Sequence, residues 1–436
     1  MPSLTSSPSP NTRRESVSEL VDHLFRYKAG QMTSALTRYF GIENLKLVED
    51  IVQDSLLKAL QQWPYRGIPA NPGGWLWQAA KNHALDVLRR EARFQKRLQG
   101  QVRLAEMEQI PTVEDISDYP FEDDQLSMMF IGCHPTLSRE VQIALVLNTV
   151  SGFSAGEIAR AFLVPEATMA QRLVRAKNKL RAEDAQFEIP PTSELTGRLD
   201  VVMNVLYLLF NEGYDAHAGD SLVRQELCFE AIHLCHLVAT HPVGQIPRVH
   251  ALLALMLLQA SRLNARTDAH GNVILLADQN RSVWDREMIH AGLHHLALSA
   301  EGDELSEYHL QAGIAARHAV AKSDESTDWV GILNDYKALL EITPSHVVLL
   351  NHAVAIARVY GPEAGLSELA KLKDHASLRK YHLLPATFGE LYERSRDYQR
   401  AAQSYRQALL LTSNEAEQRF LQKKLRASEM LLESPQ

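Results

Sequence analysis

The feature that most constrains this chain is the spacing of its apolar residues, which recur three and four positions apart along nearly all of its 436 residues. This spacing places apolar side chains on one face of a helix, whereas the alternation typical of a strand is scarce. Val17, Leu20 and Leu24 show the pattern, and the stretch from Val48 to Leu60 repeats it. We therefore predict an all-α protein.

Breaks in this periodicity divide the chain. Proline and glycine interrupt it from Trp63 to Gly74, where a loop is predicted, and again at Ile189-Pro190-Pro191, where a domain boundary is predicted. The first residues are rich in Ser and Pro. From these breaks we predict five parts: a disordered tail at 1–15, a helical domain at 16–98, a linker at 99–123, a second helical domain at 124–187 and a third at 195–436.

Composition limits where such a chain can work. Its three cysteines, Cys133, Cys228 and Cys235, argue against a disulfide framework and favour a reducing compartment. The N-terminus has no apolar segment of the kind that a signal peptide needs, and the longest apolar runs are too short to cross a bilayer. We therefore expect a soluble, cytoplasmic protein that does not contact a membrane.

Charge is distributed unevenly, although the net charge of the whole chain is −8. Seven basic residues stand against two acidic ones from Lys81 to Arg103, and five basic residues with no acidic one lie from Arg172 to Arg181. Eight acidic residues and no basic one lie from Glu106 to Asp124. Two basic helices separated by an acidic linker indicate nucleic-acid binding, with solvated helix faces as the alternative for either patch alone.

The sharpest local signal is a helical hairpin between Phe153 and Lys177. Ser154 and Glu157 have capping-box spacing and predict the start of a short helix, which buries Ile158, Ala159 and Phe162. A turn containing Pro165 leads into a second helix that buries Met169, Leu173 and Ala176. This is the pattern of a helix-turn-helix motif, and an ordinary amphipathic hairpin is the alternative.

The other face of the second helix is predicted to contact DNA. Gln171 and Arg172 carry side chains that suit adenine and guanine edges, and the basic residues after them suit phosphates. The predicted DNA-binding set is Glu166, Ala167, Thr168, Ala170, Gln171, Arg172, Arg175 and Lys177.

Two further stretches make a family resemblance visible. The stretch from Val48 to Leu56, in which acidic residues flank two aliphatics and a glutamine, looks like the polymerase-binding helix of the extracytoplasmic-function class of bacterial sigma factors. The stretch from Trp75 to Arg90 looks like the promoter-melting helix of that class, and the hairpin looks like its −35-reading domain. The order and spacing of the three motifs together resemble this class over residues 16–185.

The resemblance implies two small helical sigma domains, region 2 and region 4, and roles for the matched positions. Asp50, Gln53 and Asp54 would face the β′ clamp helices of core RNA polymerase, whose β flap would contact the second domain. The −35 element would be read by the hairpin. The −10 element would be met and melted by polar residues after Trp75: Lys81, Asn82, Asp86, Arg89 and Arg90.

The promoter-melting region would also hold an extruded base. The resemblance places that base in the loop from Pro64 to Gly74, and extrusion shifts the duplex toward the open state. Trp75 and Trp77 are possible stacking platforms for bases, but Trp75 follows two glycines and is better explained as an anchor of its helix in the core.

The last domain resembles the tetratricopeptide-like extension of one subgroup of this class. Gly389 and Tyr392, followed by Ala401, Ala402 and Tyr405, place small and aromatic residues roughly as a tetratricopeptide repeat does, with a generic helical bundle as the alternative. We expect this domain to control the sigma domains of the same chain, by inhibition or by activation.

Two groups of polar residues in the last domain could form further sites. Four histidines and two cysteines between residues 228 and 250 invite a metal site, but no second tight ligand pair has zinc spacing, so we expect no metal and no cofactor. The residues are Cys228, His233, Cys235, His236, His241 and His250. Asn280, Arg281 and Asp285 with Glu212 predict a polar network within the extension or a small-ligand site.

No phosphate-cradling loop or nucleophile–base pair is evident, so we expect no enzymatic activity. The alternative functions are a helix-turn-helix regulator that acts without core polymerase and a repeat-domain scaffold.

Overall fold

The structure is a computed structural model that describes residues 28–94, 121–162, 164–183, 185, 187–214, 223–268, 270–373, 378 and 381–433. These residues form helices and no β-strand, apart from one isolated bridge between Thr267 and Val273, which confirms the all-α prediction. None of the described helices combines the length and apolarity needed to span a bilayer. The predicted N-terminal tail and nearly all of the acidic linker lie outside the described residues.

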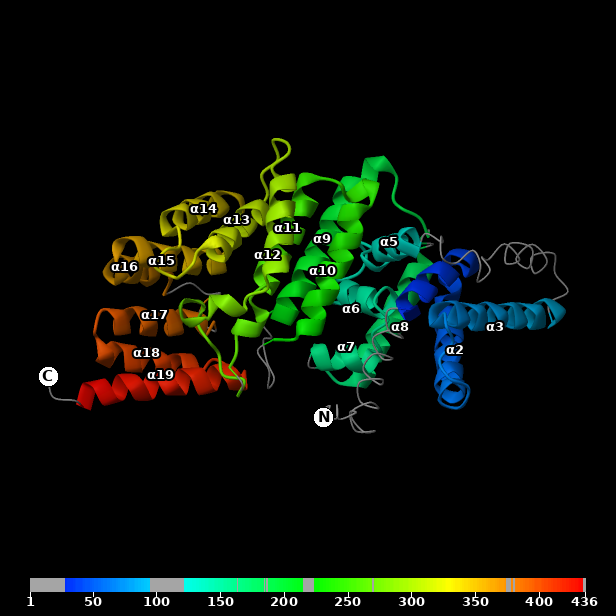
Figure 1. Ribbon diagram of the computed structural model, residues 1–436, viewed down its shortest axis with the longest axis horizontal. Helices are drawn as coiled ribbons and strands as arrows, with labels where there is room; N and C mark the ends of the chain where they lie inside the picture. Colours follow the sequence, from blue (N-terminus) through cyan, green and yellow to red (C-terminus); the bar gives the residue numbers. More distant parts are fainter. Residues whose placement is uncertain are drawn as a thin grey trace, which may run out of the picture. The chain divides into compact units, whose positions relative to one another are not determined.

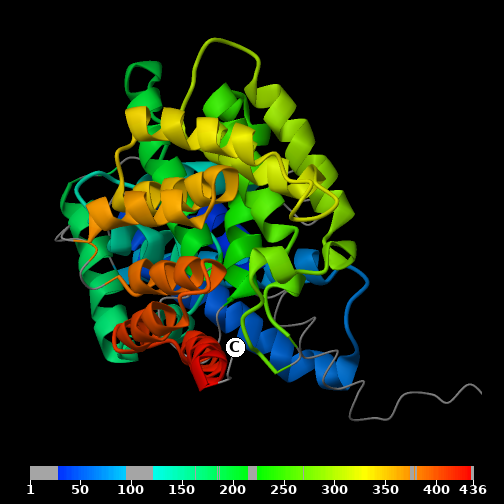
Figure 2. The ribbon, with the colours of Figure 1, turned by 90° about the vertical axis from the view of Figure 1, so that its left-hand side faces the viewer.

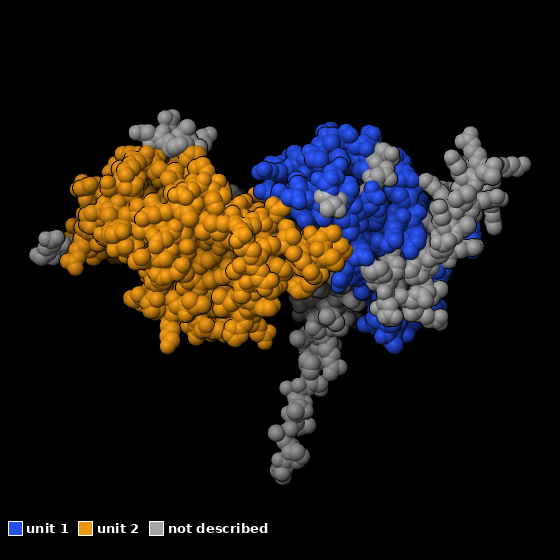
Figure 3. Space-filling model, turned by 90° about the horizontal axis from the view of Figure 1, so that it is seen from above, with its two compact units in different colours: residues 1–205 blue, residues 206–436 orange. Residues whose placement is uncertain are grey.

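The chain divides into two compact units, residues 1–205 and residues 206–436 (Figure 3). The division falls inside α9 (Thr192–Tyr214). The first unit contains both predicted sigma domains, and the second contains the rest of the chain.

The first helical group of unit 1 comprises a helix over residues 28–40, η1 (Ile42–Asn44), α2 (Leu45–Arg66) and α3 (Pro72–Phe94). The apolar stripes predicted from the sequence meet in one core, in which Leu36, Ile51 and Trp77 are at most 1% exposed. Burial of such side chains contributes about 1.5–3 kcal/mol each. The polar faces of α2 and α3 are left at the surface.

The loop between α2 and α3 is shorter than predicted: it spans residues 67–71, whereas the prediction was Trp63 to Gly74. Trp63 is 7% exposed and holds the last turn of α2 in the core. At the other end, the Oδ1 of Asn71 accepts a hydrogen bond from the backbone N–H of Gly74 at 2.8 Å. Asn followed by Pro72 is a helix start signal, and it outweighs the two glycines behind it.

The second helical group of unit 1 comprises α5 (Phe121–Gly132), α6 (Arg139–Thr149), α7 (Ala155–Ala161) and α8 (Glu166–Ala182). Nearly every residue of α5 after Asp123 is buried. The first half of α9 packs here too, because the Arg198 guanidinium donates to the main-chain oxygen of Phe130 at 2.6 Å. In Figure 1 these helices run from cyan to green.

Unit 2 is a succession of helices in which neighbours in sequence pack side by side, as Figure 2 shows for its last members. The helices after α9 are α10 (Gln225–Thr240), α11 (Pro247–Ala260), α12 (Arg286–Ser299), α13 (Glu307–Val320), α14 (Trp329–Ile342), α15 (His346–Tyr360), α16 (Pro362–Leu372), α17 (Leu383–Arg394), α18 (Tyr398–Leu409) and α19 (Glu415–Glu433).

The pair α17 and α18 follows the predicted small-and-aromatic pattern. Ala401, Ala402 and Tyr405 are at most 1% exposed, and the backbone of Gly389 lies directly against the Tyr405 ring. The Tyr405 hydroxyl donates to a Glu393 carboxylate oxygen at 2.7 Å. Helix pairing is therefore confirmed, while the assignment to tetratricopeptide repeats stays a prediction.

Candidate nucleic-acid interface

The predicted hairpin is present as α7 and α8. Ser154 caps α7 as expected, because its backbone N–H donates to a Glu157 carboxylate oxygen at 2.8 Å and its Oγ accepts from the Glu157 N–H at 3.2 Å. Ile158, Met169 and Leu173 are at most 4% exposed and join the two helices. Phe162 is only half-buried instead of buried, because it lies just beyond Ala161, the last residue of α7.

The face of α8 that was predicted to contact DNA is largely at the surface. Glu166, Ala167, Thr168, Gln171 and Arg175 are exposed, and Ala170 and Arg172 are half-buried. Glu166 lies in the first turn, where a carboxylate favours the helix dipole, and Lys179 and Arg181 lie in the last turn. The face can therefore approach a DNA groove through its first turns.

Two basic residues of this face already have acidic partners within unit 1. The Arg172 guanidinium lies 3.7 Å from a carboxylate oxygen of Glu140 on α6. The Lys177 ammonium lies 2.5 Å from a carboxylate oxygen of Glu49 on α2, and both side chains are about four-fifths buried. Sequence reasoning missed Glu49, because a contact across 128 residues leaves no local signal.

The residues predicted to meet the −10 element follow one another along α3. Asn82, Asp86 and Arg89 are exposed, and Arg89 lies 3.9 Å from Asp86. Lys81 is buried, with 8% of its surface exposed, so in this structure it does not share the exposed position expected of a residue that meets DNA. The side chain of Arg90 lies outside the described residues.

A pocket of about 440 Å³ lies between α2 and α3 beside these residues. It is lined by Asn82 and Asp86 together with Trp75, Lys58 and Gln62. Gln78, one turn before Asn82, donates to the Asn82 side-chain oxygen at 2.8 Å. The spacing of four residues between Gln78 and Asn82 is the signal that could have added Gln78 to the predicted set.

The two tryptophans of α3 differ in exposure. Trp77 is 1% exposed and packs edge-on against Phe121, with ring centroids 5.6 Å apart, so it is a core residue. Trp75 packs edge-on against Trp63 with centroids 5.7 Å apart, and it also lines the pocket. Trp75 thus combines the anchoring role with an accessible surface.

The residues predicted to bind polymerase share one side of α2. Asp50, Gln53 and Asp54 are all exposed, and His83 of α3 lies 3.6 Å from the Asp54 carboxylate. The side chains of Ile51, Val52 and Ser55 hold the opposite side of the helix in the core. An exposed acidic face suits a basic partner groove, where it sets specificity and encounter rate.

A groove of about 600 Å³ brings the two predicted interfaces together. Asp50 and Gln53 of the polymerase face line it from α2, and Ala170 and Lys177 of the DNA face line it from α8. The sequence placed these residues in separate domains, and only the fold of unit 1 puts them in one groove.

In unit 2 the predicted polar network is built around Arg281, which is 9% exposed. Its guanidinium donates to the main-chain oxygens of His318 and Ala321 at 2.6 and 3.0 Å. Asn280 and Asp285 instead accept from nearby backbone N–H groups at the start of η6 (Arg281–Val283) and of α12. Glu212 pairs with Arg224 at 2.8 Å.

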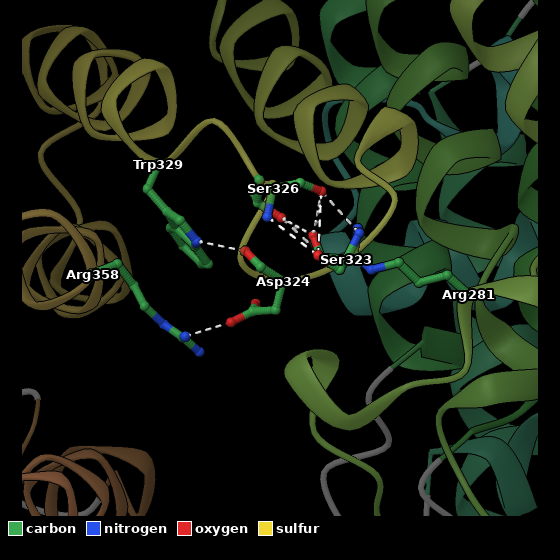
Figure 4. Close-up of polar contacts among 7 residues, drawn as sticks. Arg281, Ser323, Asp324, Ser326, Trp329 and Arg358 are labelled. Atoms are coloured by element: carbon green, nitrogen blue, oxygen red, sulfur yellow. Dashed lines mark hydrogen bonds and ion pairs between the residues drawn. The ribbon is translucent and has the colours of Figure 1, made fainter.

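The loop between α13 and α14 is held from a second side as well (Figure 4). The Arg358 guanidinium of α15 lies 2.5 Å from the Asp324 carboxylate and 4.8 Å from the Trp329 ring. The Trp329 Nε1–H donates to the main-chain oxygen of Asp324 at 3.2 Å. These contacts favour the structural reading of the network over a ligand site.

The histidines and cysteines weighed as metal ligands lie on and around α10 and α11. Burial raises the pKa of the Cys228 thiol to about 12 and raises that of Cys235 as well. His236 and His250 both lie next to His295 of α12, which sequence reasoning missed. Among the described residues, no three His, Cys, Asp or Glu side chains are arranged to hold a metal ion.

Comparison with known proteins finds family matches in both units. Residues 24–94 match the family described as Sigma-70 region 2, and residues 127–180 match Sigma-70, region 4. Residues 198–300 match a family of unknown function, DUF6596. An uncharacterised protein of Rhizobium meliloti (strain 1021) is 37% identical over 397 residues, which is 91% of this chain and 92% of that protein. No solved structure matches the chain significantly.

The two sigma-70 matches coincide with the two helical groups of unit 1 and with the surfaces on α2, α3 and α8. The third match begins in α9 and ends at the end of α12. The chain therefore belongs to the sigma-70 family, as a sigma factor of the extracytoplasmic-function type with a C-terminal extension, and it binds core RNA polymerase and promoter DNA in transcription initiation.

Proposed function

We propose that this sigma factor binds the β′ clamp helices of core polymerase through Asp50, Gln53 and Asp54. It reads the −35 element with the exposed face of α8 and melts the −10 element with α3. The observation that carries this assignment is that α2, α3 and α8 each bury an apolar face and leave most of the polar residues predicted for a partner at the surface. The polymerase then carries out the chemistry.

The pocket beside Trp75 gives promoter melting a physical basis. Extruding a base costs a few kcal/mol, and stacking on an aromatic ring returns about 1–3 kcal/mol. Trp75 offers such a ring, and Gln78 and Asn82 offer amide groups that can hydrogen-bond a base edge. We therefore place the extruded base in this pocket, next to the short loop at residues 67–71.

Run-off transcription with core polymerase tests the proposal. The full-length chain is expected to be retained by core polymerase in a pull-down and to direct a transcript from its own promoter. Arg172→Ala is expected to weaken −35 recognition by about 1–3 kcal/mol if Arg172 contacts a base. Neither core retention nor a promoter-dependent transcript would be seen if the proposal is wrong.

Reversing the charge of the α2 face separates this function from that of a regulator that works without polymerase. Asp50→Lys combined with Asp54→Lys is expected to abolish retention by core polymerase and to leave −35 DNA binding intact. Glu188→Lys, at an exposed acid outside this face, is the matched control and is expected to change neither. Unchanged core retention in the double variant would favour the regulator.

We also propose that the C-terminal helices control the sigma domains of the same chain. Their size and their direct connection through α9 support this role. Truncation after Tyr214, which keeps α9, is compared with truncation after Pro191, and transcription is measured after circular dichroism has established folding. Unchanged transcription in both would remove a regulatory role. Capture of a partner by residues 195–436 alone, without polymerase, would favour a scaffold.

A further inference from the structure

Two arginines that flank η4 (Leu263–Ala265) contact Tyr214, the last residue of α9. The guanidinium carbon of Arg266 lies 3.8 Å from the centroid of the Tyr214 ring, and that of Arg262 lies 5.5 Å from the same centroid. The Arg266 guanidinium also donates to the main-chain oxygen of Tyr214. Arg266 therefore fixes the end of α9, whereas the contact of Arg262 with this residue is through the ring.

Arg262 differs from the arginines around it in its hydrogen bonds. Arg281 donates to two main-chain oxygens, and Arg358 pairs with Asp324 (Figure 4). Arg262 donates to the side-chain oxygen of Gln259 at 2.5 Å, and no carboxylate in the described part of the chain lies within ion-pair distance of its guanidinium. A guanidinium presents several N–H donors in a rigid fork. Arg262 is half-buried and therefore keeps most of its donors unused by the protein.

Two polar groups near Arg262 also have no acceptor. The Tyr214 hydroxyl and the His318 Nδ1 are buried, and neither has a hydrogen-bond partner among the described residues. Burial and three arginine charges, that of Arg262 among them, lower the pKa of His318 to about 3, so its imidazole is neutral and carries one N–H donor. Burial also lowers the pKa of Arg262 itself. This part of unit 2 is therefore electropositive, with donors for which the described residues provide no acceptor.

An arginine in this position destabilises the native state unless a partner satisfies it. A half-buried guanidinium has lost part of its hydration, and neither an opposite charge nor enough acceptors replace the lost water here. The partner that would restore the balance is an anion with more than one acceptor atom. A carboxylate or a phosphate meets both conditions, because it can accept two parallel hydrogen bonds from one guanidinium. The charge and the donors of this region therefore favour an oxyanion.

We propose that Arg262, Tyr214 and His318 form a binding site for the oxyanion of a small molecule, either a carboxylate or a phosphate group. Arg262 supplies the charge and a pair of N–H donors, and the hydroxyl of Tyr214 and the imidazole of His318 each supply one more. The bound anion connects the ends of α9, α11 and α13, which are distant in sequence. The site lies within unit 2 and goes beyond the proposed promoter and polymerase contacts, which do not depend on it.

Calorimetric titration of the full-length chain tests the site. Inorganic phosphate and succinate are separate probes in a chloride buffer of constant ionic strength, so the probe that binds identifies the anionic group. Saturable binding of a single equivalent is expected for at least one probe. Arg262→Met is expected to raise its dissociation constant about 10- to 150-fold, the effect of losing hydrogen bonds to a charged group. Arg426→Met, at an exposed arginine of α19, is the control and is expected to leave the constant unchanged.

Stability in the absence of the anion separates a ligand-binding arginine from a structural one. Arg262→Met removes an unpaired charge and keeps a long apolar side chain beside the Tyr214 ring, so the thermal unfolding midpoint of the free protein is expected to stay the same or rise. Arg266→Met removes a hydrogen bond to the main chain at the same ring and is expected to lower the midpoint by about 3–10 °C. Differential scanning calorimetry of the full-length variants in probe-free buffer measures both.

Three results would overturn the site. The first is that neither probe binds, and the second is that the unaltered chain and Arg262→Met bind a probe equally well. The third is that Arg262→Met lowers the unfolding midpoint as much as Arg266→Met does, because Arg262 would then be a structural residue. Circular dichroism checks that the variants fold, and an Arg262→Met chain that does not fold has the same meaning as the third result. Retention by core polymerase tests the proposed function separately from all three.

Discussion

Arg281 donates from its guanidinium to the main-chain oxygen of His318 at 2.6 Å, and this bond ties η6 to the end of α13. The guanidinium is buried, and its described acceptors are neutral: a second main-chain oxygen, that of Ala321, and the hydroxyl of Thr327. A buried charge is tolerated only when its donors are satisfied. Arg281 therefore stabilises the α13–α14 loop through hydrogen bonds more than through charge pairing.

Arg281→Ala is expected to lower the free energy of unfolding of unit 2 by about 2–3 kcal/mol, because it leaves two part-buried carbonyl groups without their donor. Denaturant unfolding followed by tryptophan fluorescence measures the effect. Arg426→Ala, at an exposed arginine of α19, is the control and is expected to change stability by less than about 0.5 kcal/mol. If Arg281→Ala lowers the free energy of unfolding no more than Arg426→Ala does, the hydrogen bonds of Arg281 do not stabilise unit 2.

Unit 2 is expected to lose stability in mild acid. Burial, with neighbouring histidines or arginines, lowers the pKa of His295 to about 4 and that of His318 to about 3. In the unfolded chain both histidines have a pKa near the ordinary value of about 6.5. Their contribution to the stability of unit 2 is therefore fully present above about pH 6.5, and it is lost as the pH falls toward their pKa values in the folded protein. Each histidine can add at most about 1.4 kcal/mol per pH unit to the slope of the unfolding free energy against pH.

The variant His295→Gln checks the origin of this slope. It is expected to flatten the dependence of unfolding free energy on pH between 6.5 and 4, because it removes one imidazole that must stay neutral beside His250. His290→Gln, at an exposed histidine of the same helix, is expected to leave the slope unchanged. An unaltered slope in His295→Gln would remove the histidine cluster as its cause.

Local patterns predicted the parts of this fold that local forces determine. The capping box at Ser154, the buried face of α8 and the small residues of α17 and α18 all depend on side chains within one or two helical turns. The loop after α2 was predicted too long for the same reason. Its proline and glycines were visible in the sequence, but the burial of Trp63 that extends α2 was not.

Contacts between distant segments could not be predicted in this way. Glu49 and Lys177 are ordinary surface residues by sequence, and only packing of the two helical groups buries them. His294 and His295 join His236 and His250 because α10, α11 and α12 are neighbours in space. Such pairs depend on tertiary packing, which a single sequence does not record.

Two glycines are expected to respond in opposite ways to alanine. In Gly389→Ala the added Cβ would lie 2.6 Å from the Tyr405 ring, so α17 and α18 must move apart at a cost of about 1–3 kcal/mol. Gly197 lies in α9 with nothing within 4 Å of an added Cβ, and alanine there is expected to stabilise by about 0.5–1 kcal/mol. Thermal unfolding measures both, and a shift of the same sign in both would contradict this packing.

Removing the cap of α7 is expected to weaken DNA binding indirectly. Ser154→Ala loses the side-chain acceptor for the Glu157 N–H, which costs about 1 kcal/mol. The hairpin then frays at its start and presents α8 less firmly. Ser154→Thr keeps the acceptor and is expected to retain both stability and affinity for a −35 duplex. An equal loss of stability and affinity in both variants would contradict the capping role of the Ser154 hydroxyl.

Gln171 and Arg175 are both exposed on α8 but are expected to contribute to DNA binding in different ways. Arg175→Ala should weaken binding to all sequences and reduce the slope of log affinity against log salt by about 0.9, because one phosphate contact is lost. Gln171→Ala should keep the slope, cost about 1–3 kcal/mol on the preferred −35 sequence and cost little on others. Fluorescence anisotropy on matched and scrambled duplexes over a salt series separates the two effects. Arg139→Ala, at an exposed arginine of α6, is expected to change neither quantity. If Arg175→Ala altered sequence preference while Gln171→Ala altered the salt slope, the orientation of α8 in the groove would have to be reversed.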